Sequence, residues 1–193
     1  MKKPENTIKE RKLYIETGKQ KVVEVLCRYP DKEFSLSDLA KESNVRKSNI
    51  GMILDELNNM GFVEITKLAK IWRIKSNQTN WDFVKYKIIF NLGLIYQSNV
   101  VEFLMDYFRN PKAIILFGSF RKGEDITNSD IDIAIEVDDI KYKTIELREF
   151  APFEKFLGKK IQMHLFNRKA VDINVFNNIA NGIVLAGFLE VTP

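Results

Sequence analysis

An apolar run that leads into a short polar turn and then to two aspartates is the part of this chain best suited to chemistry. Residues 114–117 read Ile-Ile-Leu-Phe, and Gly118 and Ser119 follow directly. Ten residues later come Asp130 and Asp132, within a pattern in which apolar residues alternate with polar ones. Side chains two apart on a strand share a face and lie roughly 6–7 Å from each other. We therefore expect the two carboxylates to hold one or two Mg²⁺ ions.

The Gly118-Ser119 turn predicts a place for phosphate. It offers backbone N–H groups and a hydroxyl, and it carries no large side chain that would block an approaching anion. Arg121 and Lys122 add positive charge just past the turn. A phosphate cradle beside metal-binding carboxylates indicates nucleotidyl transfer from a nucleoside triphosphate (NTP).

This arrangement resembles the DNA polymerase beta-like nucleotidyltransferase superfamily, and in particular its small minimal branch. The resemblance covers roughly residues 112–166 and rests on Gly-Ser, a spacer of ten residues and Asp-x-Asp between apolar strands. It implies that Gly118 and Ser119 contact the triphosphate, and that the catalytic Asp130 and Asp132 bind Mg²⁺. The competing interpretation is a polar turn with solvated acids, since loops often carry Asp and Ser for turn chemistry alone.

The third carboxylate of that superfamily has no counterpart on the matching strand, residues 160–166. Gln162 and His164 occupy the face on which the acid is expected. A neutral Gln can neither accept a proton near pH 7 nor replace a carboxylate ligand well. His164, the only histidine, could accept a proton or simply be structural. Glu136 lies too far along its strand, roughly 13 Å from Asp132. Whether the chain is an active enzyme therefore stays open.

Composition limits the remaining possibilities. The chain has 193 residues, 45% of them hydrophobic, which is enough for one large or two small cores. A single cysteine, Cys27, excludes an internal disulfide and fits a reducing cytoplasm. We expect no secretory segment and no membrane span. Residues 1–80 carry 16 Lys and Arg against 11 Asp and Glu, which favours an anionic partner for this part.

The first 80 residues predict helices followed by a hairpin. Apolar spacing and capping residues indicate helices over residues 20–28, 36–43 and 46–60, with Ser35 as an N-cap and Gly61 as a terminator. Residues 62–65 and 71–74 alternate as two short strands. A short extended piece at residues 32–34 precedes the second helix.

This order resembles a winged helix-turn-helix over roughly residues 19–76. The resemblance implies that the second motif helix enters the major groove of double-stranded DNA and that the wing contacts phosphates. By position the DNA-binding residues would be Arg46, Lys47, Ser48 and Asn49 on the helix, with Lys67 and Lys70 on the wing. The alternative is a protein-docking module with a solvated basic face.

The rest of the chain predicts an α+β domain. Residues 76–80 are polar and turn-prone and are the best candidate linker. Helices are expected over residues 81–96 and 100–108, either as core or as a homodimer interface. A further helix over 143–157 is interrupted by Pro152, another covers 172–181, and the apolar residues 183–190 should pack back onto the domain.

The predicted organisation is an arm (1–18), a winged helix-turn-helix (19–76), connecting helices (77–110) and a minimal nucleotidyltransferase domain (111–193) with a mixed sheet flanked by helices. The predicted activity is Mg²⁺-dependent transfer of a nucleoside monophosphate from an NTP to an acceptor hydroxyl, a protein hydroxyl among the candidates. The alternative is a DNA-binding regulator whose transferase domain binds nucleotide without turning it over.

Overall fold

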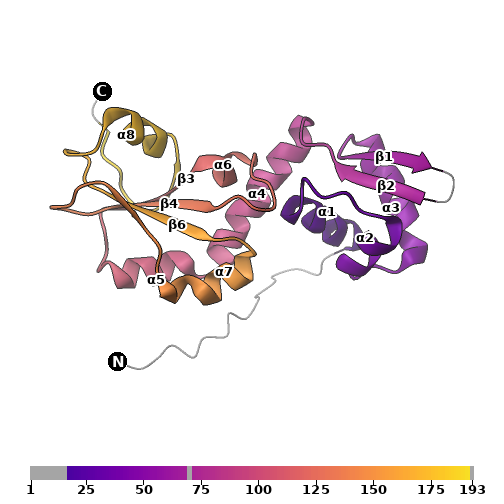
Figure 1. Ribbon diagram of the computed structural model, residues 1–193, viewed down its shortest axis with the longest axis horizontal. Helices are drawn as coiled ribbons and strands as arrows, with labels where there is room; N and C mark the ends of the chain where they lie inside the picture. The colour runs from indigo at the N-terminus through magenta and orange to yellow at the C-terminus, as the bar shows by residue number, and fades with distance from the viewer. Residues whose placement is uncertain (1–16, 69–70, 192–193) are drawn as a thin grey trace. The chain divides into compact units, whose positions relative to one another are not determined.

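The protein forms two compact units. A computed structural model describes residues 17–68 and 71–191. Contacts group residues 17–90 with residues 123–128 as the N-terminal unit, and residues 91–122 with residues 129–191 as the C-terminal unit (Figure 1). The predicted boundaries at residues 76 and 110 stay predictions, and the predicted arm, save its last two residues, lies outside the described residues.

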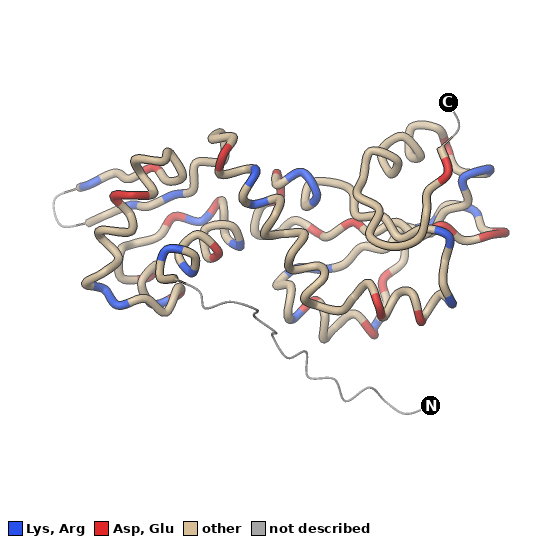
Figure 2. Tube along the Cα trace, turned by 180° about the vertical axis from the view of Figure 1, so that it is seen from behind, with Lys and Arg blue, Asp and Glu red and all other residues tan. Residues whose placement is uncertain are grey.

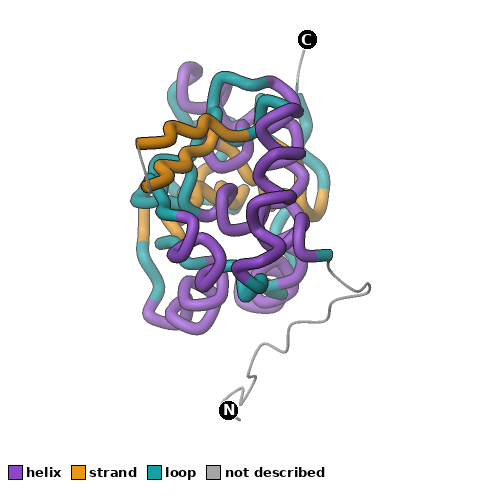
Figure 3. Tube along the Cα trace, turned by 90° about the vertical axis from the view of Figure 1, so that its right-hand side faces the viewer, coloured by secondary structure: helices purple, strands orange, loops and turns teal. Residues whose placement is uncertain are grey.

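Helices and one hairpin make up the N-terminal unit (Figure 3). Its elements are α1 (Gly18–Arg28), α2 (Leu36–Glu42), α3 (Lys47–Asn59), β1 (Val63–Leu68), β2 (Ile71–Ser76) and the first part of α4 (Trp81–Gln97).

Side-chain caps fix where these helices begin. Thr17 and Gln20 form a capping box at the start of α1, each bonding the other's backbone N–H. Ser35 accepts the backbone N–H of Asp38 at the start of α2, at 3.1 Å, which confirms the predicted N-cap.

The hairpin closes the core of this unit. β1 and β2 pair antiparallel, and Phe34 exchanges two backbone hydrogen bonds of 2.9 Å with Ile74 on the free side of β2. The short extended piece predicted before α2 is therefore part of this small sheet. The helices and the small sheet of this unit share one apolar core. Its buried members include Val22, Leu26, Phe34, Leu39, Ile50, Leu54, Leu57, Ile74 and Phe83.

Residues 76–80 are held within the N-terminal unit by hydrogen bonds. The Ser76 hydroxyl donates to the Leu26 carbonyl at 3.2 Å, and the Gln78 amide donates to the Pro30 carbonyl at 3.1 Å. The Asn80 side chain accepts the backbone N–H of Phe83 at 2.9 Å and so caps α4. The polar side chains of residues 76–80, which suggested a linker, therefore form hydrogen bonds that stabilise a turn and cap a helix.

A mixed five-stranded sheet organises the C-terminal unit. The strands follow the order β5-β6-β4-β3-β7, with β4 parallel to β6 and the other neighbours antiparallel. The elements are α5 (Val100–Tyr107), β3 (Ala113–Phe117), α6 (Gly118–Lys122), β4 (Ile131–Glu136), β5 (Lys143–Ile145), α7 (Ala151–Leu157), β6 (Ile161–Phe166), α8 (Ile173–Ala180) and β7 (Ile183–Gly187).

Helices cover both faces of this sheet. On one face, α8 packs on β3 and closes a core that contains Ala113, Ile115, Ala134, Phe166, Ile179 and Leu189. On the other side lie α5 and α7, which contact each other through Phe103 and Phe153 with ring centroids 5.0 Å apart (Figure 1). The central strand β3 is therefore apolar on both faces, and the predicted α+β class with a mixed sheet flanked by helices is confirmed. Residues 183–190 pack back as predicted, through β7.

The predicted helix over residues 143–157 is wrong in its first half. Residues 143–145 form the edge strand β5, Arg148–Phe150 is a 3-10 turn, and the α-helix begins only at Ala151. Pro152 lies in the first turn of α7, where its missing N–H costs no hydrogen bond, so it starts the helix rather than interrupting it.

Helix α6 also departs from prediction, because residues 118–122 form a short helix where a turn at Gly118-Ser119 was expected. Among the described residues, no single helix is long and apolar enough to cross a membrane. Helices α4 and α5 together pass such a test of length and composition, but only as a pair bent by 51°.

Candidate nucleotide site

The predicted nucleotide residues meet at one end of the β3–β4 pair. Phe117, the last residue of β3, is paired with Asp132 of β4, so Gly118 follows directly beside that carboxylate. Asp130 immediately precedes β4 and is exposed, whereas Asp132 lies inside the strand and is partly buried. Local strand pairing thus brings together residues that are twelve or more positions apart in the sequence.

Gly118 is required at its position for two reasons. Its φ of +73° lies in the left-handed region that side-chain-bearing residues rarely adopt. In addition, a Cβ atom at this position would lie 2.1 Å from Oδ2 of Asp132. The backbone and the carboxylate are therefore packed as closely as glycine permits, which leaves the region around Asp132 free of side-chain bulk from residue 118.

His164 occupies the place beside Asp132 where an acid was expected. In the parallel β4–β6 pair Asp132 is in register with Gln162, and His164 is two residues further along the same face. The His164 Nε2 atom lies 3.2 Å from Asp132 Oδ1, and the imidazole is nearly buried. The structure therefore places His164 in direct contact with a predicted metal ligand.

Sequence reasoning missed Tyr142, whose hydroxyl lies 2.7 Å from His164 Nδ1. Its ring stacks on the imidazole, and the Phe117 ring packs edge-on at a centroid distance of 4.9 Å. Tyr142 directly precedes β5, in which Thr144 is in register with His164. No local sequence pattern predicts that Tyr142 contacts His164, because this contact depends on the edge strand β5, which the sequence did not predict.

The remaining predicted nucleotide residues lie on α6. Ser119 and Arg121 are partly buried, and Lys122 is exposed. The Asn91 side chain on α4 is buried and donates a hydrogen bond of 2.8 Å to the Phe120 carbonyl, within the same unit. This bond fixes the short helix that carries Ser119 and Arg121.

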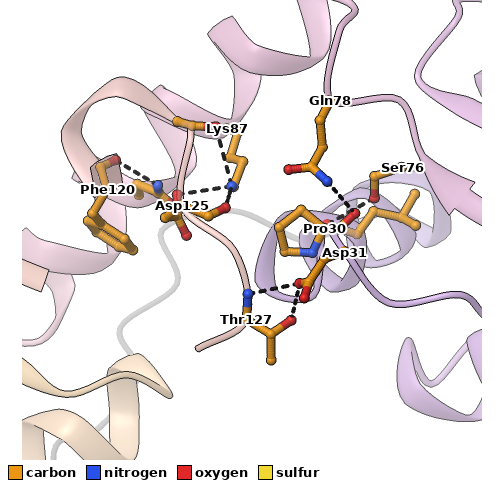
Figure 4. A network of polar contacts seen from close by, with 11 residues as sticks. Pro30, Asp31, Ser76, Gln78, Lys87, Phe120, Asp125 and Thr127 are labelled. Carbon is orange, nitrogen blue, oxygen red and sulfur yellow. Dashed lines mark hydrogen bonds and ion pairs between the residues drawn. The ribbon is translucent and has the colours of Figure 1, made fainter. Parts of the chain in front are cut away.

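The segment between the two halves of the site, residues 123–128, packs within the N-terminal unit (Figure 4). Lys87 on α4 forms an ion pair of 2.9 Å with Asp125, and it also donates to the carbonyls of Gly123 and Asp125. Asp31 accepts the backbone N–H of Thr127 at 2.8 Å and its hydroxyl as well. The spacer between Ser119 and Asp130 is therefore an anchored segment rather than a free loop.

The chemistry of the donor set fits an ion held by two carboxylates. Mg²⁺ binds oxygen ligands, usually one or two carboxylates together with waters and substrate phosphates. Asp130 is exposed, and Asp132 faces the bare backbone at Gly118 while His164 bonds its other oxygen, as ligating carboxylates commonly are bonded. Within residues 17–68 and 71–191, no group of three or more His, Cys, Asp or Glu is arranged to hold a metal by itself.

The predicted DNA-binding residues are accessible where the structure describes them. Arg46 is the residue before α3, and Lys47, Ser48 and Asn49 form its first turn; all four are exposed. Lys67 on β1 lies over the Trp72 ring, with Nζ 4.0 Å from the ring centroid. Lys70 lies outside the described residues. Lys and Arg are distributed over both units, with Asp and Glu between them (Figure 2).

Comparison with known families agrees with the C-terminal geometry. Residues 97–178 match the model of a family described as a nucleotidyltransferase domain. The match runs from α5 through β6 and includes most of α8, so it contains Gly118, Asp132 and His164. Residues 97–178 are therefore similar to a nucleotidyltransferase domain, which agrees with the prediction from the sequence.

One curated relative is named "Putative protein adenylyltransferase MJ1379", from Methanocaldococcus jannaschii. It is 43% identical over 56 residues, which is 27% of this chain, and the chain spans about half (54%) of that relative's length.

Among solved structures, two of the heme sensor protein PefR are similar at 16% identity over 48% of this chain. The complex with heme and carbon monoxide has a TM-score of 0.34 and is matched over 70% of its length; the complex with heme, from Streptococcus agalactiae, has 0.33 and 69%. Likenesses at this level carry no conclusion about this chain.

Proposed function

We propose that the C-terminal unit transfers a nucleoside monophosphate from an NTP to an acceptor hydroxyl and releases pyrophosphate. The observation that carries this proposal is the packing of the Asp132 carboxylate onto the bare backbone of Gly118, inside a stretch that matches a nucleotidyltransferase domain. Close packing of a carboxylate on a glycine backbone leaves backbone N–H groups accessible to a phosphate beside that carboxylate. A turn with a purely structural role does not require this arrangement.

Each residue of the site has a role in this proposal. Asp130 and Asp132 would hold Mg²⁺, which when bound neutralises triphosphate charge and stabilises the charge that develops at the α-phosphorus. Gly118 admits the phosphates, the Ser119 hydroxyl and backbone bind them, and Arg121 with Lys122 adds positive charge. His164 orients Asp132 through its hydrogen bond.

The acceptor is proposed to be a hydroxyl on a protein. The name of the curated relative supports this substrate class, and the match covers only about half of that relative. Serine, threonine and tyrosine hydroxyls satisfy the chemistry equally well.

The test of the transfer activity is nucleotide binding and turnover with matched variants. ATP, GTP, CTP and UTP are titrated calorimetrically with and without Mg²⁺, and release of pyrophosphate is followed separately. We expect Asp130→Asn and Asp132→Asn to lose Mg²⁺-dependent binding and turnover. Asp138→Asn, an exposed acid just beyond β4, is the control and should behave as the wild type. Unchanged turnover in Asp132→Asn would refute the proposed site.

A second candidate function is favoured by the neutral Gln162, which stands in register with Asp132 on the strand where the family resemblance implies a third carboxylate. In this alternative the C-terminal unit binds nucleotide without turning it over, and the N-terminal unit binds double-stranded DNA as a winged helix-turn-helix. The order α1, α2, α3, β1, β2 and the exposed first turn of α3 support it.

A gel-shift series tests the DNA-binding candidate. Arg46→Ala with Lys47→Ala should abolish retention of duplex DNA at modest salt and flatten the dependence of affinity on salt concentration. Lys41→Ala with Lys85→Ala removes the same charge from exposed positions on α2 and α4 and should leave more retention. Equal losses of DNA retention in both double variants would mean that only the net charge of the protein matters. That result would contradict the proposal that α3 is a recognition helix.

A further inference from the structure

A cavity of about 420 Å³ in the C-terminal unit has no part in the nucleotide site. Two basic side chains, three apolar ones and one acidic one line it: Arg168, Lys169, Val171, Ile173, Phe176 and Glu190. Pockets for small ligands commonly have this size and combine apolar walls with a few charged groups that fix the orientation of the ligand. The cavity therefore has the dimensions and the composition of a ligand site.

The cavity lies toward the opposite end of β4 from the nucleotide site. Glu136 ends β4 and is in register with Phe166, which ends β6, and Arg168 follows two residues later. Asp132 precedes Glu136 by four residues, which corresponds to roughly 13 Å along a strand. The lining shares no residue with the nucleotide site, so the cavity is a separate site.

A buried carboxylate holds the Arg168 guanidinium in place. Glu136 is 2% exposed, and its Oε1 atom lies 3.2 Å from Arg168 Nε. The other oxygen, Oε2, has no hydrogen-bond partner among the described residues. If the guanidinium turned away, Oε1 would be left buried without a partner too, which is costly. Arg168 is therefore fixed through Nε, and its two terminal nitrogens are directed to other partners.

The partner of those terminal nitrogens is Glu190, whose carboxylate marks a place for an anion. The Glu190 carboxylate forms an ion pair with Arg168 Nη2, and its backbone carbonyl accepts a hydrogen bond of 3.2 Å from Nη1. The Glu190 side chain is 59% exposed, so it can turn into solvent, whereas that of Glu136 cannot. Exposed ion pairs contribute little to stability, and another carboxylate can therefore replace that of Glu190.

We propose that this cavity binds a small aromatic carboxylic acid, whose carboxylate displaces that of Glu190 from Arg168. A guanidinium matches a carboxylate in shape and charge, and the exposed Lys169 adds a second positive charge to the lining. The aromatic body is buried against the three apolar side chains, of which Phe176 offers a ring for stacking. This site does not depend on the proposed transfer activity.

The test is calorimetric titration of the full chain with three acids, namely 3-phenylpropionate, 4-phenylbutyrate and indole-3-propionate. The ligand control is 4-phenylbutyramide, which has the shape of 4-phenylbutyrate but no charge. We expect the acids to bind, and the amide to bind about tenfold more weakly than its acid, because charge-assisted hydrogen bonds to the guanidinium are lost. Absence of binding by all three acids, or equal affinity for the amide, would refute the proposal.

Glu190→Gln tests the displacement. It keeps the size of the side chain and removes the competing charge, so the acids should bind about fivefold more tightly. Glu102→Gln removes the same charge from an exposed position on α5 and should bind as the wild type does. Unchanged or weaker binding in Glu190→Gln would mean that no carboxylate is displaced. Arg168 is left intact in these variants, because its loss would leave Glu136 buried without a partner.

Ile173→Asp tests the location of the site. Ile173 is 64% exposed in the first turn of α8, where a negative charge is compatible with the helix. An aspartate here repels the ligand carboxylate and removes apolar lining, so binding should be lost. Ile89→Asp adds the same charge at a position on α4 that is 70% exposed and outside the lining, and it should bind normally. Unchanged affinity in Ile173→Asp would show that the acids bind elsewhere and would overturn the assignment.

Discussion

Lys87 and Asp125 form an ion pair of 2.9 Å in which neither side chain is exposed. A lysine in a protein interior is costly unless its charge is matched and its hydrogens are bonded. Here the carbonyls of Gly123 and Asp125 accept further hydrogen bonds from the ammonium group. The pair therefore holds the segment 123–128, which joins the two halves of the nucleotide site in sequence.

Lys87→Met should strongly destabilise the N-terminal unit, because it leaves the carboxylate of Asp125 buried without its cation. Removal of one partner of a buried pair typically costs about 3–5 kcal/mol of unfolding free energy. Urea unfolding followed by tryptophan fluorescence measures this loss in one unit, since Trp72 and Trp81 are the two tryptophans of the chain and both belong to the N-terminal unit.

The control for this variant is on the same helix. Lys85 pairs with Asp82 at 2.5 Å, but both side chains are at least half exposed. Surface pairs of this kind contribute little, so Lys85→Met should change the unfolding free energy by less than about 0.5 kcal/mol. Similar losses in the two variants would contradict a structural role for the buried pair.

The thiol of Cys27 should react only when the N-terminal unit opens. Cys27 is buried on α1, and burial raises the pKa of its thiol far above the ordinary value, so very little thiolate forms in the folded state. Labelling by a disulfide reagent at neutral pH should be at least about a thousandfold slower than for the urea-unfolded chain.

Lys87→Met gives a second readout of the same opening. Labelling of Cys27 should accelerate in this variant by about the factor that corresponds to its loss of stability, provided that opening is fast relative to reaction. Rapid labelling of the folded wild type would show that the thiol is accessible and contradict its burial.

Gly118→Ala should disable the nucleotide site through Asp132. The methyl group would lie 2.1 Å from Oδ2 of Asp132 and so clash with it, and the left-handed backbone costs an L-residue about 1–2 kcal/mol. We therefore expect loss of Mg²⁺-dependent nucleotide binding in calorimetry, together with a modest fall in thermal stability.

Gly93→Ala is the matched glycine variant in the same unit. Gly93 lies within α4, and the nearest atom to an added Cβ is Nε2 of Gln97 at 4.0 Å. Alanine is favoured over glycine inside a helix by roughly 0.5–1 kcal/mol, so this variant should be slightly more stable and bind nucleotide normally. Normal binding in Gly118→Ala would refute the role of the Gly118–Asp132 contact.

The sequence predicted those parts of the fold that are encoded locally. Strict alternation over residues 131–136 predicted β4, and Ser35 marked the start of α2. The edge strand β5 was missed, because Lys143–Ile145 has only three residues and forms a strand through its pairing with β6. Local periodicity carries no information about such a partner.

The candidate site divides in the same way. Gly118 and Asp132 could be paired from their spacing, because a strand, a turn and a returning strand bring them together. Tyr142 and His164 could not, since their contact depends on the order and register of β5 and β6. The anchoring of residues 123–128 by Lys87 also required the structure, because a lysine within an apolar helix gives no sign of its distant partner.

Glu136 and Asp138 are two residues apart and titrate with opposite consequences for stability. Glu136 is buried, with an ion pair of 3.2 Å to Arg168. Burial raises the pKa of Glu136 above its ordinary value of 4.5, although the charge of Arg168 opposes this change. Asp138 is exposed, and the hydrogen bond from Lys112 lowers the pKa of its carboxyl below 3.8.

The two shifts predict opposite slopes of unfolding free energy against pH. The folded state holds the Glu136 proton more tightly than the unfolded chain, so its contribution is full below about pH 4.5 and is lost as the pH rises through the raised pKa. The Asp138 contribution is present above about pH 3.8 and is lost as the pH falls.

Urea unfolding of wild type, Glu136→Gln and Asp138→Asn from about pH 3 to pH 7 measures both contributions to the unfolding free energy. The wild type should lose stability relative to Glu136→Gln as the pH rises, and relative to Asp138→Asn as it falls. Parallel curves for Glu136→Gln and the wild type would contradict a raised pKa at Glu136.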